Sequence, residues 1–376
     1  MPNPASNIAE NQDKDVAISA RKAAVEVVRI LRQSGFIAFF AGGCVRDEVL
    51  GVYPKDYDVA TNATPIQIAE LFPRTSQVGA HFGVQLVKMP DAVIEVATFR
   101  TDGPYTDKRR PDSVAFSTPE DDAKRRDFTI NALFLDPLVP QNQWTGNVQG
   151  LVIDHVGGLV DLHTGIVRAV GDPQARLAED HLRALRAVRF AARLGFLVEA
   201  ATASAITQHA SDLSGVSHER IGDEVRRMLA HPTRAESMEL IEKLGLDLPV
   251  FGFGFKSPQR DPVTFSFLRA SETAGAALGR WGCNTSVHLS LAALALDTHS
   301  SPTAQDGETI ATLWRTRLCL SNEESSAVRG IFVSMELLLG EFLTMTVSKQ
   351  KRASARSRFA ESLTLVSLLE SAISQK

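Results

Sequence analysis

The sequence predicts an α+β protein in which a small mixed α/β head precedes an all-helical neck, body and tail. Over about the first 140 residues, short apolar runs with strand-like alternation are interleaved with helical segments. After about Pro173 most segments have helical spacing, with Gly-, Pro- and Ser-rich breaks and no internal repeat. We expect a flexible tail at 1–16, the head at 17–145, the neck at 146–245 and the helical body and tail at 246–376.

The elements of the head follow from apolar periodicity and from helix-start signals. After a loose tail, an amphipathic helix is expected over 17–33, ending before Gly35. Thr64 and Pro65 open a later helix, because Thr can cap and Pro suits the first helical position. The other expected elements are a strand at 36–41, a short helix at 45–50, and strands at 57–60, 84–88 and 93–99.

Further along the chain, the pattern predicts helices with identifiable starts. A long helix is expected over 177–194, and Ser321 to Glu324 forms a capping box before another. The polar stretch 102–122, rich in Gly, Pro and charge, reads as a mobile surface loop. The basic segment 349–358 (KQKRASARSR) fits either an RNA-backbone contact or a solvated tail segment.

Composition excludes several classes of protein. The chain has 376 residues, 44% hydrophobic and 22% charged, and its apolar runs fall short of a membrane span. The polar N-terminus lacks an apolar signal core, so we expect a cytoplasmic protein without membrane contact. Cys44, Cys283 and Cys319 lie far apart, which argues against structural zinc and disulfides. The net charge of −4 makes any RNA-binding surface local, and nothing indicates an oligomeric state.

Asp56 and Asp58 are the first chemical feature of the head. Residues two apart on a strand point to one side, so the carboxylates would converge and suit Mg²⁺. The spacing alone is weak evidence, since Asp13 and Asp15 repeat it in the expected tail. On spacing alone, an exposed turn is the better explanation of Asp56 and Asp58.

The surroundings of this pair favour a phosphate-handling metal site. A strand, Gly42-Gly43 and a helix stand upstream, where backbone could approach an anion closely. Arg46 in the first helical turn could hold a phosphate, or could form a solvated pair with Asp47. Glu95 interrupts an apolar strand, either as a third carboxylate of the site or as an edge-exposed residue. A phosphate cradle with two or three carboxylates suits two-metal phosphoryl transfer.

Several motifs occur in a fixed order and together resemble one family, the class II CCA-adding tRNA nucleotidyltransferases and the related bacterial poly(A) polymerases. The resemblance is strong from about residue 36 to 245 and weak beyond, where 317–324 (RLCLSNEE) is only faintly similar. The motifs are GGCVRD (42–47), KDYDVATNATP (55–65), IEVATFR (94–100), RRDFTINAL (125–133), LAEDHLRALRAVRFAARLGF (177–196) and HERIGDE (218–224).

The resemblance implies a polymerase-beta-like head and a role for each matching residue. Asp56 and Asp58 match the metal-binding catalytic pair. Glu95 lies in the matching motif IEVATFR, and its place as a third catalytic carboxylate rests on its position inside an apolar strand. Gly42, Gly43 and Arg46 match the triphosphate motif. Arg126, Asp127 and Asn131 match the motif that recognises the ribose and phosphates of the nucleotide. Glu179, Asp180 and Arg183 match the motif whose side chains pair with the incoming base. Glu219, Arg220 and Glu224 match a motif that supports those base-pairing side chains. The loop at 102–122 matches the flexible loop linked to addition of the final adenine.

Residue chemistry agrees with two of these roles. If 177–194 is one helix, Asp180 and Arg183 share a face, where an acceptor and a fork of donors could meet a base edge. Glu179 could hold the Arg183 guanidinium, although a surface salt-bridge ladder would also explain this helix. Asp127 could accept a ribose 2′-OH, or cap a helix over 128–135, or do both.

The leading interpretation is template-independent addition of CCA to the tRNA 3′ end from CTP and ATP, with Mg²⁺ as cofactor. The alternative within the family is poly(A) synthesis or addition of A alone. Cys44 in GGCVRD leans towards poly(A) polymerases, whereas 78–87 (VGAHFGVQLV) lacks the arginines typical of them. A metal-dependent phosphohydrolase in the C-terminal half would need an adjacent His-Asp ligand pair. The sequence has no His-Asp dipeptide, and Asp297 and His299 are the nearest approach, so we reject this hypothesis. A catalytically dead RNA-binding protein is disfavoured by the intact carboxylates.

Overall fold

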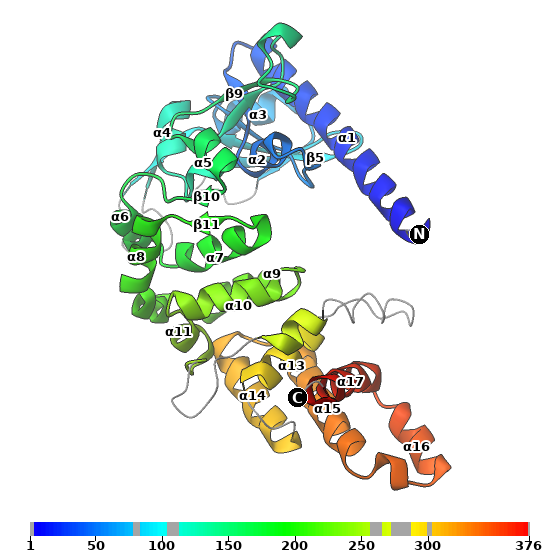
Figure 1. Ribbon diagram of the computed structural model, residues 1–376. Coiled ribbons are helices and arrows are strands. Elements are labelled where there is room, and N and C mark those ends of the chain that lie inside the picture. The colour runs from blue at the N-terminus through cyan, green and yellow to red at the C-terminus, as the bar shows by residue number, and fades with distance from the viewer. Residues whose placement is uncertain are drawn as a thin grey trace. The chain divides into compact units, whose positions relative to one another are not determined.

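The computed structural model describes residues 4–77, 83–103, 113–255, 265–271, 287–298 and 303–374 (Figure 1). The chain divides into two compact units, residues 1–180 and 181–376. The first is mixed α/β and the second is almost entirely helical, which confirms the predicted fold class. The finer division at residues 145 and 245 stays a prediction. Within the described residues, no helix is both long and apolar enough to cross a bilayer, and the expected cytoplasmic location stays a prediction.

The first unit contains a seven-stranded sheet in the order β3-β4-β5-β2-β1-β8-β9. Strands β2 and β5 run parallel, and the other pairs described in this sheet run antiparallel. The strands of the unit are β1 (Ala38–Ala41), β2 (Asp58–Thr61), β3 (Thr75–Gln77), β4 (Val84–Lys88), β5 (Val93–Thr98), β6 (Arg100–Asp102), β7 (Val114–Phe116), β8 (Phe134–Asp136), β9 (Leu151–Ile153) and β10 (Ile166–Val167).

The helices of the first unit cover this sheet and its ends. Helix α1 packs on β1, β2 and β5, as Figure 1 shows at the blue end of the chain. Phe99 and Phe134, both fully buried, meet edge to face in the core. The helices are α1 (Pro4–Gln33), α2 (Gly43–Val49), α3 (Pro65–Leu71), α4 (Pro119–Lys124), η1 (Thr129–Asn131), η2 (Gln141–Gln143), α5 (Gly158–Thr164) and α6 (Pro173–Glu179).

The second unit is a stack of helices. Helix α7 packs against α9 and α10, and α15 packs against α13, α14 and α17. The elements are α7 (Arg183–Leu194), β11 (Leu197–Val198), α8 (Ala200–Gln208), η3 (Ala210–Gly215), α9 (His218–Leu229), α10 (Arg234–Lys243), α11 (Asp247–Phe251), α13 (Val287–Thr298), α14 (Ala304–Arg317), α15 (Asn322–Leu339), η5 (Phe342–Thr344), α16 (Val347–Ser354) and α17 (Phe359–Ser374).

Both predicted caps are confirmed. Thr64 caps α3, forming a capping box with Gln67 while Pro65 takes the first helical position. Ser321 caps α15 in the same way, with its backbone N–H donating to Glu324 Oε2 at 2.7 Å. Asp297 accepts the backbone N–H groups of Phe267 and Leu268, both at 3.0 Å, so its carboxylate is engaged as a local cap. His299 and Cys283 lie outside the described residues.

Three expectations about the elements of the head are wrong. Helix α1 begins at Pro4, within the expected loose tail, and Pro suits a first helical position. The expected helix over 128–135 is a 3₁₀ turn followed by β8, whose sheet pairing with β1 and β9 overrides helical propensity. The loop at 102–122 is partly structured, since β6 pairs with β7 and α4 follows; residues 104–112 lie outside the described part.

Candidate active site

Three predicted carboxylates come together where β2 and β5 lie side by side. Asp58 is the register partner of Glu95 on the parallel neighbour. Asp56 precedes Asp58 by two residues, and the buried Tyr57 separates them. The charge of Asp56 acts on both Asp58 and Glu95, so the three carboxylates lie near one another. The fold thus assembles the carboxylate cluster, while its catalytic role stays a prediction.

The three carboxylates repel one another. Burial and then the neighbouring Glu95 raise the pKa of Asp58 from 3.8 to about 6, with a further contribution from Asp56, and Arg126 opposes the shift. Burial and Asp56 likewise raise the pKa of Glu95. The Asp58 side chain is still exposed to solvent. The burial contribution to its pKa comes from the many protein atoms that surround the carboxylate. A divalent cation bound by these oxygens would relieve the repulsion.

Binding of a divalent cation at this cluster is expected to weaken as the pH falls through about 6. The ion binds the ionised carboxylate, and Asp58 holds its proton to a higher pH than a free Asp. Below that pH, one linked proton lowers the apparent affinity by up to about tenfold per pH unit. Calorimetric titrations at about pH 5 and pH 8 measure this effect. Equal affinities at the two pH values would contradict it, and Asp58→Asn should flatten the dependence.

Gly42 and Gly43 form the turn between β1 and α2. Gly42 has a φ of 76°, which favours glycine, and its N–H donates to the Leu133 carbonyl at 3.0 Å. A Cβ at Gly42 would lie 2.8 Å from Nη1 of Arg126. Arg126 also lies close enough to Asp58 to lower its pKa. The turn, Arg126 and the carboxylate cluster therefore occupy one region of the first unit.

Behind this turn, Arg46, Asn131 and Asp127 form a hydrogen-bonded chain. Arg46 is 5% exposed, donating from Nη1 to Asn131 Oδ1 at 2.7 Å and from Nε to Asp47 at 2.8 Å. Nδ2 of Asn131 donates in turn to Asp127 Oδ1 at 3.2 Å, and that oxygen also accepts the Phe128 N–H. Arg46 and Asp47 thus pair in a largely buried setting rather than a solvated one. The predicted contact of Arg46 with a triphosphate stays a prediction.

Asp122 is a positioning residue that the sequence reading missed. It is 1% exposed; Oδ1 accepts from Arg125 at 2.7 and 2.9 Å, and Oδ2 accepts from Arg126 at 2.9 and 3.1 Å. Although burial raises its pKa, Arg126 and Arg125 bring the pKa below its ordinary value. The spacing of three and four residues in DAKRR is the signal that could have identified it.

Asp122→Asn is expected to destabilise the first unit by about 2 kcal/mol and to weaken nucleotide binding. The change leaves Arg126 without its anionic partner and leaves Arg125 with only the longer pair to Asp102, at 3.8 Å. The partial exposure of both arginines reduces the cost from that of a fully buried pair. Urea unfolding and nucleotide titration measure the two effects. Glu120→Gln on the same helix is the control, because its pair with Lys124 is exposed and should change neither quantity. Unchanged stability in Asp122→Asn would contradict the role.

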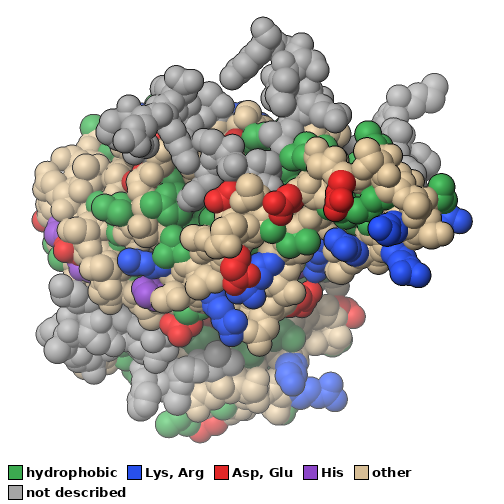
Figure 2. All heavy atoms as spheres, turned by 90° about the horizontal axis from the view of Figure 1, so that it is seen from below, with side chains coloured by type: hydrophobic (Ala, Val, Ile, Leu, Met, Phe, Trp, Pro, Cys, Tyr) green, Lys and Arg blue, Asp and Glu red, His purple; other side chains and the backbone are tan. Residues whose placement is uncertain are grey.

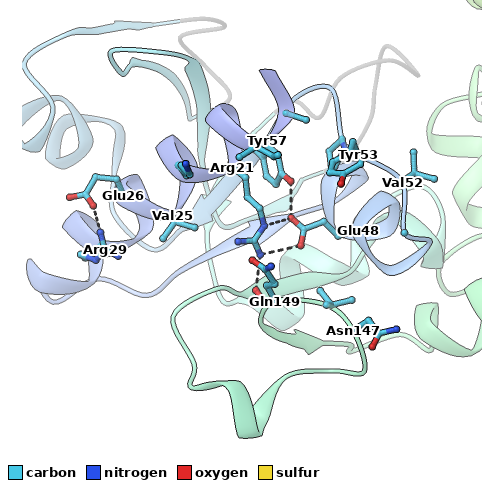
Figure 3. Close-up of a pocket in the computed structure, with 16 residues that line it drawn as sticks. Arg21, Val25, Glu26, Arg29, Glu48, Val52, Tyr53, Tyr57, Asn147 and Gln149 are labelled. Carbon is cyan, nitrogen blue, oxygen red and sulfur yellow. Dashed lines mark hydrogen bonds and ion pairs between the residues drawn. The ribbon is translucent and has the colours of Figure 1, made fainter. Parts of the chain in front are cut away.

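On the other side of β2, a pocket is lined by α1, the end of α2 and the segment 147–149 (Figure 3). Glu48 accepts from Nε of Arg21 and from the Tyr57 hydroxyl, both at 2.8 Å, and Arg21 also donates to the Gln149 carbonyl. Tyr57 packs edge-on against Phe40. None of the three carboxylates is among the described residues that line this pocket. The contacts of Tyr57 with Glu48 and Phe40 therefore hold in place the residue that precedes β2.

The base-recognition motif is not one helix, and this corrects the predicted helix over 177–194. Helix α6 ends at Glu179, Asp180 has extended backbone, and α7 begins at Arg183. The argument that Asp180 and Arg183 share a helix face is therefore wrong. Helix α6 starts earlier than expected because Asp172 caps it and Pro173 takes its first position. Glu179 accepts from Nη1 of Arg176 at 2.6 Å, and Arg183 is buried at the start of α7.

Glu224 joins α7 to α9 within the second unit. It is 3% exposed and accepts from Nε of Arg189 at 2.6 Å, with Arg186 and Arg227 as further ion-pair partners. This agrees with the supporting role that the motif implies for Glu224. Glu219 and Arg220 lie on the same helix in the first turn, where Glu219 is exposed.

The basic segment 349–358 lies on α16 and the residues after it. Lys349, Lys351, Arg352 and Arg356 are exposed, and Figure 2 shows Lys and Arg side chains gathered over this part of the surface. Arg358 instead pairs with Glu361 and Glu323. Exposure agrees with both alternatives for the segment, an RNA-backbone contact and a solvated surface.

Comparison with known proteins identifies two domains. Residues 38–168 match the poly A polymerase head domain, and residues 195–251 match a probable RNA and SrmB-binding site of polymerase A. A CCA-adding enzyme of Geobacillus thermodenitrificans is 40% identical over 234 residues, 62% of this chain and 55% of that protein. A CCA-adding enzyme of Enterococcus faecalis is 44% identical over 209 residues, 55% of this chain and 49% of that protein. The chain spans about half the length of the curated relatives it matches.

Solved structures share the fold over nearly the whole chain. A tRNA-processing enzyme complex has a TM-score of 0.70 at 21% identity, covering 93% of this chain and 89% of that one. A tRNA nucleotidyltransferase complexed with a primer tRNA and an incoming ATP analog has a TM-score of 0.68 at 24% identity, covering 93% and 96%. At these identities the likeness shows the fold alone.

Proposed function

We propose that this protein is a nucleotidyltransferase that extends the 3′ end of RNA, because residues 38–168 match the poly A polymerase head domain and residues 195–251 match a probable RNA-binding site of polymerase A. We further propose that it adds CCA to tRNA from CTP and ATP. One observation carries the proposal: the parallel register of β2 and β5 sets Glu95 beside Asp58, with Asp56 close by. This is the carboxylate arrangement that metal-assisted phosphoryl transfer requires.

In the proposed reaction the tRNA 3′-hydroxyl attacks the α-phosphate of the nucleotide in line with the departing pyrophosphate. Asp56 and Asp58 would hold Mg²⁺, which suits an all-oxygen ligand set. Mg²⁺ in such a site lowers the pKa of the attacking hydroxyl and stabilises the pyrophosphate. Arg126, fixed by Asp122 beside the Gly42 turn, would stabilise negative charge on the phosphates. Asp127 would accept a hydrogen bond from the ribose 2′-hydroxyl and so favour ribonucleotides.

Base selection is proposed to lie with the motif residues that follow the head. Asp180 and Arg183 would supply the acceptor and donors that pair with an incoming cytosine or adenine. An ion pair supports this proposal: Glu224 of α9 accepts a hydrogen bond from Arg189 of α7. This contact holds α7, the helix that begins at Arg183, in place. Glu179 would act through Arg176, its partner in α6. Glu219 and Arg220 complete the proposed set.

The alternative is a poly(A) polymerase or an enzyme that adds only A. Relatives at about 40% identity are CCA-adding enzymes, which favours CCA addition over this alternative. The head carboxylates serve either activity equally well, so the difference would lie in base selection and in RNA binding.

The test uses tRNA transcripts that end before CCA, after C and after CC, together with an unrelated RNA. Each is incubated with CTP, ATP or both, and the products are sized on a gel. We expect two C and then one A, on tRNA only. Long runs of A on any RNA would establish the alternative, and a single A added only after CC would indicate an A-adding enzyme.

A further inference from the structure

A second group of metal-ligand side chains lies in the second unit, in addition to the head carboxylates. His181 precedes α7, His209 lies between α8 and η3, and Asp212 lies in the first turn of η3. One ligand atom from each of the three side chains lies within 4.8 Å of the other two. Nδ1 of His209 and Oδ2 of Asp212 are 2.8 Å apart, and the rings of His181 and His209 have centroids 5.7 Å apart.

The surrounding backbone holds these side chains in place. His181 is 3% exposed, and His209 and Asp212 are partly buried. The Asp212 N–H donates to the His209 carbonyl at 3.0 Å, which closes the turn that carries both ligands. Helix α8 and η3 pack on one another, and η3 packs on α11. The chelating turn therefore exists in the fold before any ion binds.

The two imidazoles and one carboxylate of this cluster favour a transition-metal ion over Mg²⁺ or Ca²⁺. Imidazole nitrogen suits zinc and its neighbours among the transition metals, whereas Mg²⁺ and Ca²⁺ prefer oxygen ligands. Ligand bonds of about 2.0–2.2 Å in tetrahedral geometry place ligand atoms about 3.3–3.6 Å apart. The 2.8 Å separation and the 4.8 Å limit in this cluster bracket that spacing, so small side-chain shifts would suffice.

We propose that His181, His209 and Asp212 form a binding site for a divalent transition-metal ion, with zinc as the best fit, and that a water completes the coordination. The bound ion would tie the start of α7 to the α8–η3 turn. Since α7 begins at Arg183, zinc would stiffen the segment that carries this buried residue. The proposal stands independently of the nucleotidyltransferase activity. The simpler explanation is an ion pair between His209 and Asp212 at i, i+3 spacing.

The experiment is a calorimetric titration of the full chain with Zn²⁺, in an Asp56→Asn/Asp58→Asn background that disables the head carboxylates. We expect one equivalent of zinc to bind and to raise the unfolding temperature. His209→Ala should weaken binding by more than the roughly 10–100-fold that loss of an outer-shell partner costs. Asp212→Asn should weaken it as well. His163→Ala, which changes an exposed histidine of α5, is the matched control and should bind as the parent does.

Two results would overturn the site: no zinc binding in the parent, or equal affinity in the parent and His209→Ala. Circular dichroism without metal checks that each variant is folded. If His209→Ala does not fold, Asp212→Asn decides, because its side chain is more exposed than that of His209. Unchanged zinc affinity in a folded Asp212→Asn would leave only the simple ion pair.

Discussion

Asp58→Asn is expected to lower the rate of nucleotide incorporation at saturating substrate by about a thousandfold or more. Metal-assisted phosphoryl transfer draws several kcal/mol of transition-state stabilisation from the ion, and about 4 kcal/mol corresponds to a thousandfold in rate. Asn keeps the shape of the side chain and removes its charge. Incorporation of labelled CTP or ATP into a tRNA transcript, measured under single-turnover conditions, reports this step directly.

Loss of folding cannot mimic this result, because the metal-free variant should be at least as stable as the parent above about pH 6. There the ionised Asp58 repels Glu95 and Asp56, and burial disfavours its charge, so Asn removes an unfavourable interaction. The matched control is Asp15→Asn, which alters the other Asp-x-Asp of the chain at an exposed position and should keep full activity. Full activity in a folded Asp58→Asn would exclude a metal-holding role for this carboxylate.

The two Asp-x-Asp segments show what local pattern can and cannot predict. Asp13 and Asp15 fall within the bounds of α1, which is a helix and not a strand. Asp56 and Asp58 precede and begin a strand, and their partner Glu95 comes from another strand. Spacing is identical in the two segments, so only the motifs around 56–58 favoured that pair. The parallel register that completes the cluster is a long-range contact with no local signal.

Errors in the elements also have a tertiary origin. Phe134 and Leu135 fit a helix locally, yet both are fully buried in β8 between two other strands. Helical periodicity runs through 177–194, but Asp180 is extended and His181 and Leu182 are buried beside it. Caps are predicted well at Thr64 and Ser321, because capping depends on residues within one turn.

Gly222→Ala is expected to destabilise the second unit by about 3 kcal/mol or more. Gly222 is a helical residue of α9, and a Cβ there would lie 2.0 Å from the Leu318 carbonyl oxygen. The same carbonyl accepts from Nη2 of Arg226 at 3.2 Å, and the Cys319 carbonyl accepts at 2.8 Å. Arg226 also pairs with Glu324, which completes the capping box of α15 with Ser321. Backbone so restrained cannot move aside cheaply, so overpacking costs more than the gain in helix propensity.

Gly215→Ala separates this steric effect from a general intolerance of side chains in the unit. Gly215 ends η3, and a Cβ there meets no atom within 4 Å, so stability should hold or rise slightly. Urea unfolding followed by far-UV circular dichroism reports on both variants, since the unit is mainly helical. A large loss in Gly222→Ala alone would mean that the weakly matching segment 317–324 is docked on α9 by backbone contact. Equal stability of the two variants would contradict that close approach. The docking would then explain why 218–224 and 317–324, far apart in the sequence, both keep family-like motifs.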